Sequence, residues 1–412
     1  MSQIEPDIVV IGAGVIGLTT AYELAKRGHG VTLLERDAVQ SAPDEQVSGY
    51  RSASSWAASG ILPPANLTGS TDPMDRLRGL SHQLYPALAD ELTSRTGIDC
   101  QLERCGGWYL SDSVGETAAM AGMVAYWDEL GIDCQQRALN ALEQAEPALQ
   151  AWCRQSSATT HQKTLHRRAW WVPDEYAIRT PRLLRALLAG CKQLGVKVID
   201  NCQIDDINLD SLRLSYTRSS GDTPSDRLVA SKLIVCAGAL TGQLDRRMQL
   251  HRSLIPIRGQ ILLYQMPQRC LQSVINIGHR YLVPRRDGKV LVGSMEEEVG
   301  FQHGTTPREL SSLRRFATDL CPALKDADEL MAWSGLRPMT FDGFPMIGKL
   351  PDHDSVFVAA GHFRSGVHLA PATATCLVDL IEGIAPAVDL EPFSVGKQQY
   401  RATTDSRAVP AN

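Results

Sequence analysis

The sequence predicts an α/β protein in which a domain built on a parallel sheet is interrupted by a second, α+β domain with an antiparallel sheet. Three observations predict this fold. A strand, a glycine turn, a helix and a second strand follow one another within the first 35 residues, short apolar runs return near residues 196 and 232, and residues 254–298 alternate like an antiparallel meander. At 412 residues the chain is too long for one ordinary domain and fits two intertwined ones.

The first predicted unit is a βαβ unit. Residues 7–11 form a continuous apolar run, which suits a parallel strand buried on both faces. After the glycine turn, residues 18–27 have helical spacing, and Gly28 or Gly30 ends that helix. Residues 31–34 then make the second strand. Such a unit belongs to a parallel sheet covered by helices.

The next hundred or so residues alternate between loops and helices. Residues 38–55 are polar and rich in Ser, which predicts a loop. Residues 72–150 are mostly helical in pattern, with leucines at four-residue steps, and a short strand interrupts them at residues 106–111. Residues 154–168 are polar and basic, so we expect a surface excursion before a strand at 169–172.

The remaining elements return to the parallel sheet and then to the meander. Thr180 is expected to cap a helix over residues 181–194, with proline in its first turn. Short strands are expected at 196–199 and 232–236, and a turn at Asp287–Gly288 divides the meander. The predicted division is a nucleotide-binding domain of residues 1–75, 165–245 and 338–412, and a second domain of residues 76–164 and 246–337.

Composition excludes several classes of protein. Hydrophobic residues make up 43% of the chain and charged residues 21%, as in ordinary globular proteins. A net charge of −5 and the lack of a basic stripe argue against nucleic acid as a partner. Ten cysteines without metal-ligand or CxxC spacing indicate reduced thiols and no metal site. No export signal or long apolar run is evident, so we expect a cytoplasmic location and no membrane span.

The glycine turn predicts a dinucleotide. Gly12 permits the tight turn, Gly14 lets the backbone approach a pyrophosphate, and Gly17 allows close packing of helix and strand. The start of the helix then offers free N–H groups to the phosphates. Glu35, at the end of the second strand, is placed to accept ribose hydroxyls and repels a 2′-phosphate. This pattern disfavours NADP, but it does not separate FAD from NAD.

Motifs spread along the whole chain carry a family resemblance. They are VVIGAGVIGLTTAYELAKRG, the segment of residues 57–64, CAGALTG, RYLVPR, VGSM, WSGLRPMTFDGFPMIG and AAGHFRSGVHLAPATA. With these motifs the chain resembles the D-amino-acid oxidase superfamily of flavoproteins, and most closely its glycine oxidase (ThiO-like) branch. The resemblance implies a Rossmann-like FAD-binding domain of the glutathione-reductase type, an α+β substrate domain, and a link to thiamine synthesis.

The resemblance also implies non-covalent FAD and a set of contacts to it. No cysteine lies in the AGHFRSGV turn, which disfavours a covalent flavin link. The contacts implied beyond Gly12, Gly14 and Gly17 are Val15, Ile16, Glu35 and Arg36 for the ADP half, Ser54, Ser55, Ser59, Gly60 and Ile61 for the pyrophosphate and isoalloxazine, Ile204 for the adenine, Gly238, and Gly361, His362, Phe363, Arg364, Ser365, Gly366, Val367 and His368 around the flavin's pyrimidine end.

Carried over in the same way, Arg337 resembles the arginine that binds a substrate carboxylate. A guanidinium is always charged and can hold a carboxylate through two parallel hydrogen bonds. Arg364 resembles a second arginine that contacts the substrate near the flavin, and Tyr281 resembles a tyrosine whose phenol helps to hold the carboxylate. Each of the three has a structural alternative. Arg337 could instead bridge the two domains, Arg364 could form an ion pair that braces a loop, and Tyr281 could be a core residue of the meander.

Three further residues are expected at the pocket. Met295 matches a wall position, and His279 lies at the mouth. Trp56 stands where the family keeps a small residue, so it either narrows the pocket or packs outward. His368 likewise replaces an aliphatic residue. These departures concern the substrate more than the cofactor.

The predicted activity is FAD-dependent oxidative deamination of glycine or another small D- or N-methyl amino acid. The products would be a 2-oxo acid, ammonia and hydrogen peroxide, with oxygen as the electron acceptor. Two alternatives stay open: a D-amino-acid or N-methyl-amino-acid dehydrogenase that reduces a quinone or carrier protein, and a flavin-binding subunit of a larger complex. The sequence also leaves a homo-oligomer open.

Overall fold

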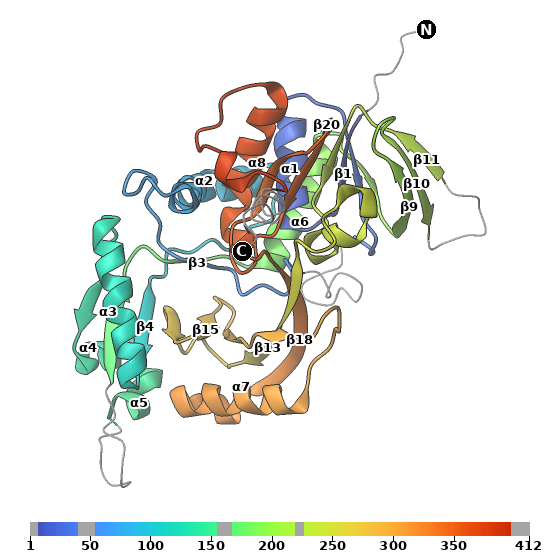
Figure 1. Ribbon diagram of the computed structural model, residues 1–412. Coiled ribbons are helices and arrows are strands. Elements are labelled where there is room, and N and C mark those ends of the chain that lie inside the picture. Colours follow the sequence, from blue (N-terminus) through green and yellow to red (C-terminus); the bar gives the residue numbers. More distant parts are fainter. Residues whose placement is uncertain (1–6, 40–53, 155–166, 219–225, 397–412) are drawn as a thin grey trace, which may run out of the picture.

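The computed structural model describes residues 7–39, 54–154, 167–218 and 226–396 (Figure 1). Two large sheets organise this part of the chain. A six-stranded sheet lies in the upper part of Figure 1, and a larger, mostly antiparallel sheet lies below it. The mixed α/β fold class predicted from the sequence is confirmed. The predicted domain boundaries stay a prediction.

The six-stranded sheet has the strand order β19-β20-β12-β1-β2-β8. Strands β8, β2, β1, β12 and β20 run parallel to their neighbours, and β19 is antiparallel at the edge. The apolar runs of β1 and β2 are fully buried because helices cover one face and a smaller sheet lies near the other. The bounds are β1 Ile8–Ile11, β2 Val31–Leu34, β8 Lys197–Ile199, β12 Lys232–Val235, β19 Met346–Leu350 and β20 His353–Ala360.

Four helices pack together on this sheet's helical face: α1 (Val15–Lys26), α2 (Pro73–Thr96), α6 (Thr180–Gln193) and α8 (Gly366–Glu382). Helix α2 is capped by the Asp72 carboxylate, which accepts hydrogen bonds from the next turn, and it ends at the left-handed Gly97. The prediction that Thr180 caps α6 is wrong by one residue. Arg179 is the N-cap, and the Thr180 hydroxyl instead donates to the Ala58 carbonyl at 2.9 Å.

Two small sheets were not expected from the sequence. Strands β9 (Cys202–Asn208), β10 (Arg213–Arg218) and β11 (Asp226–Val229) form an antiparallel sheet at the right of Figure 1. Strands β3 (Ile61–Leu62) and β7 (Tyr176–Ala177) pair as a short two-stranded sheet. The β9–β11 strands are rich in exposed polar residues, so their apolar alternation is weak.

The lower sheet has the order β17-β13-β16-β15-β14-β4-β6-β5, and β18 pairs with β13 on the side opposite β16. The antiparallel strands predicted for residues 254–298 are present, but only β14, β15 and β16 follow one another as a meander. Strand β13 pairs with β16 and not with β14, and the chain adds β18 beside β13 much later. The bounds are β4 Gly107–Ser111, β5 Gln135–Arg137, β6 Arg168–Val172, β13 Ile255–Gln265, β14 Val274–Ile277, β15 Arg280–Pro284, β16 Lys289–Gly293, β17 Glu297–Glu298 and β18 Asp328–Met339.

Helices α4, α5 and α7 cover the outer face of this sheet, whereas α3 packs on the other face, where its Trp127 contacts Tyr109. Figure 1 shows α7 below β13 and β18, and α3, α4 and α5 beside β4. Their bounds are α3 Val114–Glu129, α4 Leu139–Ala145, α5 Gln150–Arg154 and α7 Pro307–Leu320, and the short 3₁₀ helices are η2 Pro147–Leu149, η3 Gly238–Gln243, η4 Arg246–Met248, η5 Pro322–Asp326 and η6 Glu391–Phe393. Within the described ranges, no helix is long and apolar enough to cross a membrane.

The inner face of the lower sheet, turned toward β3 and β7, carries a buried carboxyl. Glu175 is fully buried. Its carboxylate accepts hydrogen bonds from the Tyr109 phenol and, at 3.1 Å, from the Asn276 amide. Gly107 makes the room, since an added Cβ would lie 2.6 Å from the Glu175 Cδ. Burial raises the pKa of Glu175 to about 7.

We expect Glu175→Gln to change how stability depends on pH. Because the folded pKa of Glu175 lies above the unfolded value of about 4.5, the folded state binds the proton more tightly. Its contribution to the free energy of unfolding is therefore complete below pH 4.5 and is lost as pH rises through about 7. Between pH 4.5 and 8 the free energy of unfolding of the wild type should fall by on the order of 3 kcal/mol relative to that of Glu175→Gln, as measured by urea unfolding. The exposed Glu129→Gln is the control, and a constant difference between wild type and Glu175→Gln would contradict this assignment.

Candidate active site

The glycine turn lies between β1 and α1. An added Cβ on Gly12, whose φ is +104°, would lie 2.5 Å from the Cys236 carbonyl oxygen. An added Cβ on Gly17 would overlap the Gly12 carbonyl oxygen. Glycine is therefore required at both positions, and the turn sits at the carboxyl end of β1 and β12, where parallel α/β sheets bind nucleotides.

The start of α1 is the phosphate-facing end of this turn. Gly14 is the N-cap and supplies no side chain, and the first turn carries no acid. The Val15 N–H donates to the Ser55 hydroxyl at 2.9 Å, so the predicted Ser55 reaches the same helix end from 40 residues away. The side chains of Val15 and Ile16 are buried in the core, which leaves only their backbone to face a ligand.

Glu35 closes the turn from the end of β2. Its carboxylate accepts the Ala13 N–H at 2.7 Å and the Asp37 N–H at 2.9 Å, and burial raises its pKa. Arg36 is exposed and pairs with Asp37 at 3.2 Å. The Cys202 N–H bonds the Glu35 carbonyl, which brings the first strand of the small antiparallel sheet, with Ile204, beside Glu35.

Residues 54–61 connect this region to the lower sheet. The Ser54 hydroxyl donates to the Leu336 carbonyl on β18, and the Ser59 carbonyl accepts Arg285 at 2.6 Å. An added Cβ on Gly60, whose φ is +74°, would overlap the Ile178 carbonyl oxygen. Next to it, Ile61 pairs with Ala177.

The residues present fit FAD. Gly238 follows β12 with a φ of +56°, and an added Cβ there would meet no described atom within 4 Å. Open space therefore lies beside the glycine turn, where the start of α1 presents backbone N–H groups to phosphates. The predicted contacts 54–61 and 361–368 lie at the ends of β18 and β20, toward the lower sheet.

The turn after β20 joins this region to β18. His362 forms an isolated antiparallel β-bridge with Met339, and the Phe363 N–H donates to the Pro338 carbonyl at 2.9 Å. An added Cβ on Gly361, whose φ is +83°, would lie 2.5 Å from Thr340 Cγ2. The strand that holds Arg337 is thus fixed to the turn that holds Arg364. Ser365 follows as the N-cap of α8, which begins at Gly366 and Val367.

The two histidines of this segment face the protein. His362 Nε2 lies 3.1 Å from the Thr373 hydroxyl, and burial lowers its pKa to about 3. The His368 ring packs edge-on against His82 of α2, with centroids 5.8 Å apart, and burial lowers its pKa to about 3 as well. With pKa values this far below 7, both imidazoles are weak bases, so neither is matched to accept a proton near pH 7.

Arg337 projects from β18 over the inner face of the lower sheet. One terminal nitrogen donates to the Ser294 hydroxyl at 2.6 Å and the other to the Met295 carbonyl at 3.1 Å. Desolvation lowers the pKa of Arg337, and the Tyr281 phenol partly opposes this effect by raising the pKa of the guanidinium. The structure therefore brings Arg337, Tyr281 and Met295 together.

Arg364 and His279 lie farther out. Arg364 is exposed, and its guanidinium pairs with the Glu296 carboxylate at 3.2 Å. His279 is an exposed residue of the turn between β14 and β15. Desolvation and the positive charges of Arg280 and Arg364 lower its pKa.

Trp56 packs in the core and not in an open pocket. It is 4% exposed, and its ring stands edge-on to Trp333 with centroids 5.3 Å apart. The Trp333 indole nitrogen donates to the Ala57 carbonyl at 3.3 Å. Of the two readings of Trp56, this geometry favours packing away from the substrate.

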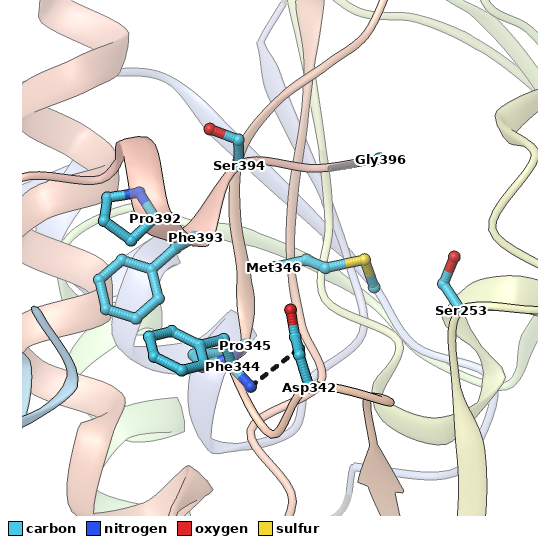
Figure 2. A pocket seen from close by; sticks show the side chains of 9 residues that line it. All are labelled: Ser253, Asp342, Phe344, Pro345, Met346, Pro392, Phe393, Ser394 and Gly396. Carbon is cyan, nitrogen blue, oxygen red and sulfur yellow. Dashed lines mark hydrogen bonds between the residues drawn. The ribbon is translucent and has the colours of Figure 1, made fainter. Parts of the chain in front are cut away.

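A separate cavity lies at the turn between β18 and β19, beside η6 (Figure 2). The Asp342 carboxylate accepts the Phe344 N–H at 3.0 Å, the dashed line in Figure 2. None of its nine lining residues is a predicted site residue; they are Ser253, Asp342, Phe344, Pro345, Met346, Pro392, Phe393, Ser394 and Gly396. The cavity is distinct from the Arg337 region.

Several neighbours of the predicted residues were missed from sequence. Ser294 and Glu296 contact the two arginines directly, and Ser294 lies in the VGSM motif that helped carry the resemblance. Gly259 and Gly293 border the side chains of Arg337 and Tyr281. A glycine inside a predicted strand marks a close approach of another group, and this was the available signal for both.

Comparisons with known proteins agree with this geometry. A family model described as FAD dependent oxidoreductase matches residues 7–380. The chain is 32% identical to a glycine oxidase of Pseudomonas aeruginosa, over 94% of this chain and 98% of that one. It is 28% identical to a bifunctional ThiO/ThiG protein of Trichormus variabilis, over 97% of this chain and 56% of that one. The crystal structure of glycine oxidase from Geobacillus kaustophilus superposes with a TM-score of 0.82 at 28% identity, covering 95% of this chain and 98% of that one.

We expect Glu35→Gln to weaken FAD binding. The glutamine retains one acceptor for the Ala13 and Asp37 N–H groups, but it turns an N–H group toward the other donor and toward a ribose hydroxyl. One lost charge-assisted hydrogen bond predicts an FAD dissociation constant about 10-fold higher, measured by flavin fluorescence in equilibrium dialysis. Asp90→Asn, an exposed change of the same charge, is the control. Equal FAD affinity in Glu35→Gln and wild type would exclude this role.

Proposed function

The chain belongs to the family of FAD-dependent oxidoreductases and acts as an FAD-dependent amino-acid oxidase, and we propose that it oxidises glycine or another small D- or N-methyl amino acid. The products proposed are a 2-oxo acid, hydrogen peroxide and ammonia, or methylamine in place of ammonia when the substrate is an N-methyl amino acid, with oxygen as the electron acceptor. The similarity to glycine oxidases over nearly the whole chain supports the substrate class. A role in thiamine synthesis stays a prediction.

The hydrogen-bond partners of Arg337, which are all uncharged among the described residues, are the observation that carries this proposal. Among the described residues, no carboxylate lies within ion-pair distance of its guanidinium, which is bonded to a hydroxyl and a carbonyl. Two other arginines with little exposed surface are neutralised: Arg258 pairs with Glu297 at 2.9 Å, and Arg179 pairs with Asp287 at 2.9 Å. The Glu296 carboxylate acts on Arg337 only from beyond ion-pair distance and is itself paired with Arg364. Desolvating a cation without a close counter-ion is costly, so this arginine favours a bound anion.

The hydrogen bonds of Arg337 also indicate how that anion would bind. A guanidinium has about five N–H groups, and Ser294 and Met295 accept from two of them. The remaining N–H groups can bond a carboxylate, with the Tyr281 phenol beside them. Two parallel bonds fix the orientation of the carboxylate, and with it the position of the α-carbon.

Arg364 is assigned a lesser role. Its charge is already paired with Glu296, and both side chains are exposed to solvent. Screening by water makes such a pair weak, so a substrate gains less from Arg364 than from Arg337. We therefore place Arg364 at the mouth of the pocket, near Met295 and His279, where it draws an anionic substrate inward.

Positioning accounts for most of the chemistry that the chain itself supplies. FAD, held by the glycine turn, Glu35 and residues 54–61 and 361–368, supplies the hydride acceptor when bound. Arg337 and Tyr281 would orient the substrate. Both His362 and His368 are buried and weakly basic, so we assign no general base.

The proposed function is tested by reacting the purified, FAD-loaded protein without oxygen against glycine, sarcosine and D- and L-amino acids. We expect flavin bleaching with glycine or another small member, followed by one hydrogen peroxide per substrate after oxygen is admitted. Bleaching that is reversed by a quinone and not by oxygen would identify a dehydrogenase. Absence of bleaching with every amino acid would contradict the proposal.

Arg337→Ala should lower kcat/KM for the best amino acid about 100-fold or more, because two charge-assisted hydrogen bonds to the carboxylate are lost. Arg337→Lys keeps the charge without the fork and should recover only part of that loss. Arg308→Ala, which removes a 93% exposed arginine side chain, is the control. An unchanged kcat/KM in Arg337→Ala would show that the carboxylate binds elsewhere.

Arg364→Ala should have a smaller effect than Arg337→Ala. Because Glu296 already neutralises this arginine, we expect KM to rise less than about 10-fold and kcat to change little. Steady-state peroxide assays at low and high salt measure the effect, and added salt should reduce the difference in KM between Arg364→Ala and wild type. A loss as large as that of Arg337→Ala would place Arg364 at the carboxylate instead.

A further inference from the structure

We infer that Gly259 and Gly293 are positioning residues that let Arg337 and Tyr281 meet above the sheet. Both glycines lie inside strands, on the inner face of the lower sheet. The inference rests on the proposed function in one respect: it takes the Arg337–Tyr281 pair as the place where a substrate carboxylate binds.

The strand order forces Arg337 to cross a neighbouring strand. Arg337 belongs to β18 and lies opposite Ile257 of β13. Its hydrogen-bond acceptors, Ser294 and Met295, follow the end of β16, on the other side of β13. Neighbouring strands are about 4.8 Å apart, so the arginine side chain must pass over the β13 backbone to reach them.

Gly259 is the point on β13 where this crossing takes place. An added Cβ at Gly259 would overlap both terminal nitrogens of Arg337 and lie 2.5 Å from its Cζ. Gly259 lies within regular β13, paired with Gly335, and it is not among the glycines with a positive φ. Its backbone therefore suits any residue, and the reason for glycine here is space for the guanidinium.

Gly293 does the same for Tyr281 from the other side. Tyr281 of β15 lies directly opposite Gly293 of β16. An added Cβ at Gly293 would lie 2.5 Å from Cε2, Cζ and the phenol oxygen of Tyr281. The end of the Tyr281 ring and its hydroxyl therefore lie directly above Gly293, and the residue is 8% exposed.

The two crossings converge on one place. In the order β15-β16-β13-β18, the outer strands supply the functional side chains and the inner strands supply the glycines. Arg337 donates to Ser294, and the Tyr281 hydroxyl lies over Gly293, the residue just before Ser294, so the two side chains end in the same region. A side chain at either glycine would keep them apart, so the glycines set the geometry of the carboxylate site.

Gly259→Ala is the sharper test because the group it displaces is the end of a flexible side chain. The protein should fold with an unchanged melting temperature and FAD content, while the guanidinium moves off its two acceptors. We expect the dissociation constant for glycolate, a carboxylate probe read by flavin absorbance, to rise about 10- to 100-fold. KM for the amino acid should rise more than kcat falls. Gly122→Ala, where an added Cβ meets no described atom within 4 Å, is the matched control.

A double-mutant cycle separates positioning from general damage. In the Arg337→Ala background, Gly259→Ala should have almost no further effect on the glycolate dissociation constant. Equal losses in both backgrounds, or equal glycolate affinity in Gly259→Ala and wild type, would overturn the inference.

A chemical probe keeps the inference separate from the proposed function. The rate at which phenylglyoxal modifies Arg337, followed by peptide mass, needs no substrate and should increase several-fold in Gly259→Ala. An unchanged rate contradicts the positioning role even if wild type oxidises amino acids. A wild type that neither binds glycolate nor oxidises amino acids contradicts the proposed function, while an increased phenylglyoxal rate in Gly259→Ala still supports the positioning of Arg337.

Discussion

The structure around the candidate site depends on one half-buried guanidinium that lacks a carboxylate partner among the described residues. Arg337 is bonded to a hydroxyl and a carbonyl, which orient it without cancelling its charge. An acid in place of Ser294 would hold the arginine more strongly and would also compete with any substrate carboxylate. The neutral acceptors therefore leave the positive charge of Arg337 available to a ligand. The unfavourable free energy of partly desolvating the guanidinium is offset by the other interactions that stabilise the fold.

Segments that are far apart in the sequence meet around this arginine. Ser54 is tied to the residue before Arg337, and Phe363 is tied to the residue after it. The long pairing of β13 with β18 fixes the strand between these two ties. Strand β18 thus ties together the two segments proposed to contact the flavin and the arginine proposed to bind the substrate.

The sequence predicted the parts of the site that have a strong local signal. Gly12, Gly17 and Glu35 lie in a fixed spacing after a buried strand, and their geometry follows from that spacing. Arg337 and Arg364 were proposed by resemblance, but the resemblance did not indicate that Glu296 pairs with Arg364. That pairing depends on how β16 ends relative to β20, which is a tertiary property.

Other features could not be read from local pattern. A tryptophan at position 56 suggested either a narrowed pocket or outward packing, and only its contact with Trp333 of β18 favours one of them. Strands β9 and β10 have too little apolar alternation to be predicted, although they place Ile204 near Glu35. The roles of Gly259 and Gly293 arise from side chains that cross between strands, so they become visible only when the register is known.

A crystal structure of the FAD-loaded protein with a small bound carboxylate that mimics the substrate would test directly whether Arg337 binds the carboxylate. We expect the carboxylate to bond Arg337 through two N–H groups, with the Tyr281 hydroxyl in contact and with Ser294 and Met295 still bonded to the guanidinium. A carboxylate bound to Arg364 alone, with an acidic side chain or water at Arg337, would contradict this expectation.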